Sequence, residues 1–131
     1  MDQQEIDRRW ETAREHLKAA SLCHDQGLHR SSVTRSYYCA YQAMWVALGD
    51  PPIREWRHRG AIDTFCYGRW ATPVFIPTAL AQLRNRLVDL YTLRLTGDYG
   101  ALGVSAQESS DGINTALEVL RLVAQQKGLV L

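Results

Sequence analysis

The sequence lacks the cysteine pattern of a disulfide-rich or zinc-binding protein. Its three cysteines, Cys23, Cys39 and Cys66, are odd in number, and no two of them form a CxxC pair. A disulfide framework needs paired cysteines, and structural zinc sites typically use such CxxC pairs. We therefore expect neither kind of site, and the free thiols favour a reducing cytosol.

Long apolar runs, an excess of one charge and strand-like alternation are also scarce. No apolar run approaches the ~20 residues that span a bilayer, and the charged N-terminal segment is unlike a signal peptide. The net charge of +1 excludes a global field that would attract nucleic acid or membrane, so a basic site would have to be local. Because no segment has a convincing period of two, a β-sheet is not expected. The expectation is a cytoplasmic protein without membrane association.

What the chain does contain is helical periodicity, over most of residues 1–131, a length that suits one domain with a single core. Apolar stripes predict a helix that ends near Gly27, a second over 28–48, and another from about 75 to the "TGDYG" segment. A shorter helix is expected over about 55–67. The last helix should begin at the capping box of Ser105 and Glu108 and end at Gly128. The predicted fold is all-α, an antiparallel bundle of four to five helices.

The segment "RSYYCAYQAM" (35–44) lies in the second predicted helix and has two different faces. The expected core face consists of Val33, Tyr37, Ala40, Tyr41, Met44 and Leu48. The other face consists of Arg35, Tyr38, Gln42 and Trp45. Large side chains that also form hydrogen bonds are enriched at protein interfaces. This second face is either turned towards a cleft or partner, or a partly exposed helix flank, and its composition favours neither.

Three segments resemble signatures of the HEPN domain family (higher eukaryotes and prokaryotes nucleotide-binding). They are the Arg and Tyr-Tyr segment "SVTRSYYCAYQAMWVAL", the His-x-Gly segment "HRGAIDTF" and the segment "LYTLRLTGDYG". Their order and spacing match the family, and the resemblance covers nearly the whole chain. It implies a HEPN-like bundle that forms a homodimer. It also implies a nucleotidyltransferase partner in a toxin–antitoxin or defence pair, and an RNA or nucleotide ligand.

The resemblance also implies which residues line the cleft of such a protein. The catalytic candidates are Arg35, His58 and Arg94, and the ligand-binding candidates are Tyr38, Gln42, Asp98 and Tyr99. In catalytic members an arginine holds the scissile phosphate and a histidine transfers the proton of a ribose 2′-hydroxyl. Such a metal-independent endoribonuclease needs no cofactor.

The sequence departs from the family pattern at the histidine. Catalytic members have an arginine, four to six further residues and then a histidine, but no histidine follows Arg94. Gln42 stands where relatives with the Tyr-Tyr signature often have histidine, and glutamine cannot act as a general base near neutral pH. Arg9 and His16 match the spacing on the first predicted helix, where the family does not place its site, and we interpret them as coincidental. We expect His16, His24 and His29 on solvated helix flanks.

Several residues keep two interpretations. His58 is either a hydrogen-bonded structural histidine or a catalytic one, and Asp98 either pairs locally with Arg94 or faces the cleft. The basic runs at 54–59 ("REWRHR") and 84–86 ("RNR") either grip phosphates or are solvated. Two functions follow: an RNA- or nucleotide-acting protein, or a catalytically silent dimeric module or neutralising subunit in which Trp45 belongs to the dimer face.

Overall fold

The computed structural model describes residues 1–71, 77–99 and 103–131, and the side chains in these ranges except those of residues 77, 78, 98 and 99. All regular structure in these ranges is helical. The helices are α1 (Gln3–Asp25), α2 (His29–Leu48), α3 (His58–Tyr67), α4 (Pro77–Tyr99) and α5 (Ala106–Lys127). The predicted all-α fold is confirmed, and the helices begin and end within a few residues of their expected bounds.

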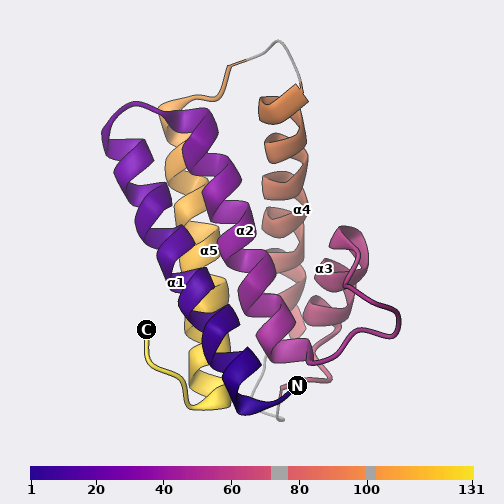
Figure 1. The fold of residues 1–131 in the computed structure, drawn as a ribbon. Helices are drawn as coiled ribbons and strands as arrows, with labels where there is room; N and C mark the ends of the chain where they lie inside the picture. The colour runs from indigo at the N-terminus through magenta and orange to yellow at the C-terminus, as the bar shows by residue number, and fades with distance from the viewer. Residues whose placement is uncertain (72–76, 100–102) are drawn as a thin grey trace.

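Four of the helices form an antiparallel bundle (Figure 1). α2 lies between α1 and α4, with α5 behind it, and the short α3 packs beside the lower parts of α2 and α4. Both chain ends lie in the lower part of the view. The tight turn between α1 and α2 uses a positive φ of 76° at Gly27, a conformation that glycine adopts without strain.

The local signals for helix ends act as the sequence predicts. The Ser105 hydroxyl accepts a hydrogen bond from the Glu108 backbone N–H, and the Glu108 carboxylate accepts one from the Ser105 N–H, both at 3.0 Å. This capping box satisfies two backbone donors at the start of α5. At the start of α1 the Asp2 carboxylate accepts a hydrogen bond from the Glu5 N–H at 2.8 Å.

The central helix α2 is buried on most of its circumference because the other four helices all pack against it. The expected core face is confirmed: Leu48 is half-buried and the other five residues of that face are buried. The expected outward position of Trp45 is wrong, since its side chain is only 8% exposed. Helical periodicity assumes one buried face, whereas a helix enclosed by four neighbours buries several.

Within the described part of the chain, no helix is both long enough and apolar enough to cross a membrane.

Candidate functional site

Polar side chains join α1 to α2 at two levels of the bundle. Arg9 Nη1 donates a hydrogen bond to Gln42 Oε1 at 3.1 Å, and Arg35 Nη1 lies 3.3 Å from His16 Nδ1. Since arginine has no acceptor, His16 Nδ1 must accept this bond. Arg9 and His16 are seven residues apart, and so are Gln42 and Arg35, which is two turns on each antiparallel helix.

Arg9 makes two further contacts beside the one with Gln42. Its guanidinium carbon lies 3.7 Å from the ring centroid of Trp45, and its Nε pairs with the Glu5 carboxylate at 3.1 Å. Stacking on an aromatic face and pairing with a carboxylate both favour the guanidinium. Gln42 and Trp45 are therefore held in a contact between α1 and α2.

A second cluster joins α2, α3 and α4 around two adjacent tyrosines. The Tyr37 hydroxyl and His58 Nδ1 are 2.6 Å apart, and Arg94 Nη2 donates to the Tyr38 hydroxyl at 2.7 Å. The Arg94 guanidinium carbon also lies 4.9 Å from the centroid of the Tyr38 ring. His58 stacks on Tyr91 with ring centroids 5.3 Å apart and an angle of 22° between the planes. The cluster therefore joins residues of all three segments that resemble HEPN signatures.

A pocket of about 540 Å³ opens beside this cluster, between α2, α4 and the residues that lead into α3. Its lining residues are Tyr38, Tyr41, Glu55, Trp56, Arg57, His58, Arg59 and Tyr91. The lining contains two arginines and a histidine but only one carboxylate, so it is more basic than acidic. Most of the run "REWRHR" thus reaches a pocket wall that also carries aromatic rings.

Burial controls the protonation of the His58–Tyr37 pair. It lowers the pKa of His58 below 6.5, and the nearby Arg94 charge lowers it further, against a smaller opposing effect of Glu55. Burial also raises the pKa of the Tyr37 phenol well above its ordinary value of 10. Both side chains are consequently neutral at pH 7.

The lowered pKa of His58 predicts that stability falls on acidification. The unfolded chain takes up a proton at this residue as the pH drops through 6.5, while the folded chain does not until the pH reaches its lower pKa. Because the unfolded state then binds more protons, the free energy of unfolding decreases as the pH falls through this window. Urea unfolding at pH 8, 7, 6 and 5 should show this decrease, with a smaller one in His58→Gln. An identical pH dependence in the variant would contradict the assignment.

The structure brings some of the predicted site residues together and places others apart. Tyr38, His58 and Arg94 are brought together, and Arg35 lies next to His16 on the α1 side of Tyr38. Gln42 is held by Arg9 further along α2. The side chains of residues 98 and 99 lie outside the described residues.

Arg9 and His16 on α1, whose spacing in the sequence looks coincidental, both contact predicted site residues of α2. His16 is half-buried and its ring centroid lies 6.1 Å from that of Tyr38, so it does not lie on a solvated flank as expected. His24 is also engaged, through a 2.8 Å hydrogen bond between its Nδ1 and Ser109 Oγ. In the sequence, the contacts of Arg9 and His16 with α2 are indicated only by a shared spacing: Arg9 and His16 are seven residues apart, as are Arg35 and Gln42.

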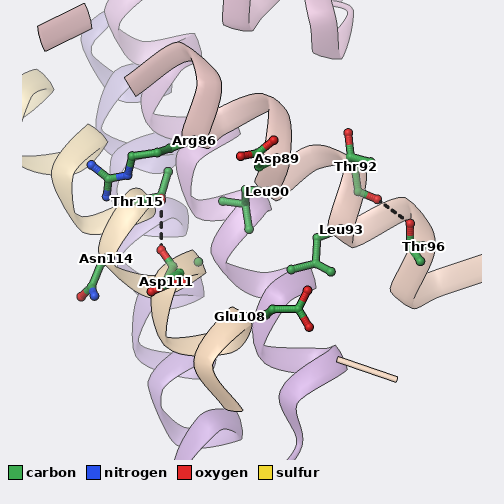
Figure 2. Close-up of a pocket in the computed structure, with 11 residues that line it drawn as sticks. Arg86, Asp89, Leu90, Thr92, Leu93, Thr96, Glu108, Asp111, Asn114 and Thr115 are labelled. Atoms are coloured by element: carbon green, nitrogen blue, oxygen red, sulfur yellow. Dashed lines mark hydrogen bonds between the residues drawn. The ribbon is translucent and has the colours of Figure 1, made fainter. Parts of the chain in front are cut away.

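A larger pocket, of about 660 Å³, lies in the groove between α4 and α5 (Figure 2). Its charged lining residues are Arg86, Asp89, Glu108 and Asp111, and Arg86 also forms an ion pair with Glu118. Three carboxylates against one arginine disfavour a phosphate ligand. None of the predicted site residues lines this groove, so the smaller pocket beside His58 is the better candidate.

Among the described residues, no three histidine, cysteine or acidic side chains gather closely enough to hold a metal ion.

Sequence comparison relates the chain to a UPF0332 protein of Gloeobacter violaceus. The two are 31% identical over 88 residues, which make up 67% of this chain and 67% of the relative. No family profile matches the sequence.

Proposed function

The chain belongs to the UPF0332 family, and we propose that it is a HEPN domain that binds RNA or a nucleotide in the pocket beside His58. The observation that carries this proposal is the composition of that pocket. Tyr38, His58 and Tyr91 come from three separate segments of the sequence, each of which resembles a HEPN signature, and all three line one cavity. A binding site requires residues from distant segments to meet in one place, and a match to a single motif does not show that they do.

The chemistry of the lining suits a nucleic-acid ligand. Tyrosine rings offer faces on which bases stack, at about 1–3 kcal/mol per base. Arg57 and Arg59 are exposed at the pocket and present planar guanidinium groups that match phosphate geometry. Such contacts are local, which agrees with a net charge of only +1.

The same site supports a metal-independent endoribonuclease. His58 would take the proton of a ribose 2′-hydroxyl; the 2′-oxygen would then attack phosphorus, and the bond from phosphorus to the 5′-oxygen would break. The leaving 5′-oxygen would take a proton from water. Because His58 Nδ1 is bonded to Tyr37, its Nε2 is the nitrogen left for this transfer, and it is unprotonated when Nδ1–H donates to the tyrosine oxygen. Arg94 would stabilise the charge that develops on the phosphate.

One observation favours the alternative, a catalytically silent dimeric module or neutralising subunit. Gln42 cannot titrate and its amide oxygen is already bound by Arg9, so it offers no general base. In either role we propose a cytoplasmic homodimer that works with a nucleotidyltransferase in a toxin–antitoxin or defence pair. A small nucleotidyltransferase gene next to this one, and copurification of the two products, would support that partnership; separate elution of the two proteins would contradict it.

The binding proposal is tested by fluorescence anisotropy with a labelled single-stranded RNA. The double variant Arg57→Gln/Arg59→Gln should bind at least about tenfold more weakly, because the loss of even one hydrogen bond to a charged group costs ~1.5 kcal/mol or more. The control Arg8→Gln/Arg121→Gln removes the same charge from exposed positions on α1 and α5 and should bind nearly as the wild type does. No binding by the wild type at about 100 µM, the weak end of sequence-independent affinities, would contradict the proposal.

Once RNA binding is established, an RNA cleavage assay distinguishes the endoribonuclease from the catalytically silent module. A nuclease should lose cleavage in His58→Gln while RNA affinity and the folded fraction stay close to wild type. Intact RNA after long incubation with the wild type, at concentrations where the protein is dimeric, would leave the silent module as the function.

A further inference from the structure

The exposed Arg35 guanidinium and the half-buried His16 ring lie next to each other between α1 and α2. The Arg35 side chain is exposed, and its Nη1 lies 3.3 Å from His16 Nδ1. Among the described residues, no carboxylate lies within ion-pair distance of Arg35. A guanidinium without a carboxylate partner, next to an imidazole ring that becomes a second donor when it is protonated, forms a local site for an anion.

This pair lies next to the candidate pocket, with Tyr38 between the two. The centroid of the Tyr38 ring is 6.1 Å from that of His16 and 6.4 Å from that of His58. The two histidines approach from different sides, since α1 and α3 flank α2 and do not pack against each other (Figure 1). A chain that extends from the pocket across Tyr38 would therefore meet Arg35 and His16 next.

We propose that Arg35 and His16 bind a second phosphate, so that the site takes a single-stranded RNA of more than one nucleotide, with Tyr38 placed between successive phosphates. The inference rests on the proposed function, and it goes further by naming the ligand as an oligonucleotide instead of a mononucleotide. Stacking of a base on Tyr38 and binding of its flanking phosphates are the two interactions that single-strand sites combine.

The charge state of His16 agrees with this role. Burial lowers the pKa of His16, the Arg35 charge lowers it further, and Glu15 raises it by a smaller amount. Without a ligand His16 is neutral at pH 7 and accepts the hydrogen bond from Arg35. A phosphate between the two would favour the protonated ring and raise this pKa, which NMR titration of the histidine ring protons can follow.

The test compares two ligands with one pair of variants. The ligands are a labelled RNA of about ten nucleotides, within the range that single-strand sites cover, and a nucleoside monophosphate. Arg35→Gln should weaken binding of the RNA by about tenfold and leave the mononucleotide within about twofold of wild type, because only the RNA reaches the second phosphate position. It should also reduce the slope of log affinity against log salt by about 0.7, the value for one phosphate contact of a single strand. The control Arg8→Gln removes an exposed charge from α1 and should change neither affinity appreciably.

The outcomes separate this inference from the function on which it rests. If the wild type binds RNA but Arg35→Gln weakens both ligands equally, or neither, the second phosphate position is wrong and the pocket beside His58 stands. If the wild type binds neither ligand, the proposed function fails and this inference fails with it. Because Arg35 is exposed, its variant should keep the thermal midpoint of the wild type, which confirms that a loss of affinity is not a loss of fold.

Discussion

Replacement of Tyr37 by alanine is expected to lower the free energy of unfolding by about 3–5 kcal/mol, the usual range for removing a large buried aromatic side chain. Tyr37 is fully buried in α2 and its ring contacts those of Tyr38, Tyr41 and Tyr91 at centroid distances of 5.2–6.2 Å. The variant would leave a cavity where three helices meet. Chemical denaturation at pH 7.5 measures the change directly.

Tyr37→Phe is the matched control, because it removes only the hydroxyl. It keeps the ring packing but leaves His58 Nδ1 without its partner, so the expected loss is about 1–2 kcal/mol. A loss in Tyr37→Phe as large as in Tyr37→Ala would mean that the hydrogen bond, and not the packing, dominates. A loss below ~1 kcal/mol in Tyr37→Ala would contradict the burial of this ring.

Trp45→Ala should also destabilise the monomer by about 3–5 kcal/mol, because its indole is buried and covered by Arg9. Trp45→Phe should cost much less. The buried indole Nε1 has no hydrogen-bond partner in the described structure, and an unsatisfied buried donor itself costs ~1–3 kcal/mol. Tyr67→Ala, at a side chain that is 72% exposed, should stay within about 0.5 kcal/mol of wild type.

The Trp45→Ala variant also tests whether Trp45 lies in an interface between two copies of the chain. Sedimentation of Trp45→Ala under conditions where it is folded should show the same association state as the wild type, since α1 already covers the indole. A variant of wild-type stability that no longer self-associates would return Trp45 to the dimer face that the sequence suggested.

Local signals in the sequence are sufficient to predict the helices and the residues at which they begin and end. The capping box of Ser105 and Glu108 depends on two residues three positions apart, so nothing beyond the segment is needed to predict it. The stripe of Tyr37 and Met44 on α2 likewise follows from the helical period alone. Such features depend on residues close together in the chain, so one sequence is enough to predict them.

Contacts between helices could not be read in the same way. The helical period predicts an outward Trp45 because it shows which residues share a face, but not how many neighbours enclose the helix. The sequence predicts His16 on a solvated flank because it does not show the contact with Arg35, which depends on the register of α1 against α2. That register is fixed by packing across the bundle, which a single sequence records only indirectly.

The register of α1 against α2 has a consequence for how the family can change. Arg9 contacts Gln42, and His16 contacts Arg35 two turns along. Both contacts form at once only because Arg9 and His16 on α1 are separated by the same number of residues as Gln42 and Arg35 on α2. Loss of one residue between Arg9 and His16 would rotate one of them by about 100° relative to the other and break a pair. Among relatives, insertions should therefore collect in the turn near Gly27, and the residues at positions 9 and 42 should covary, as should those at positions 16 and 35.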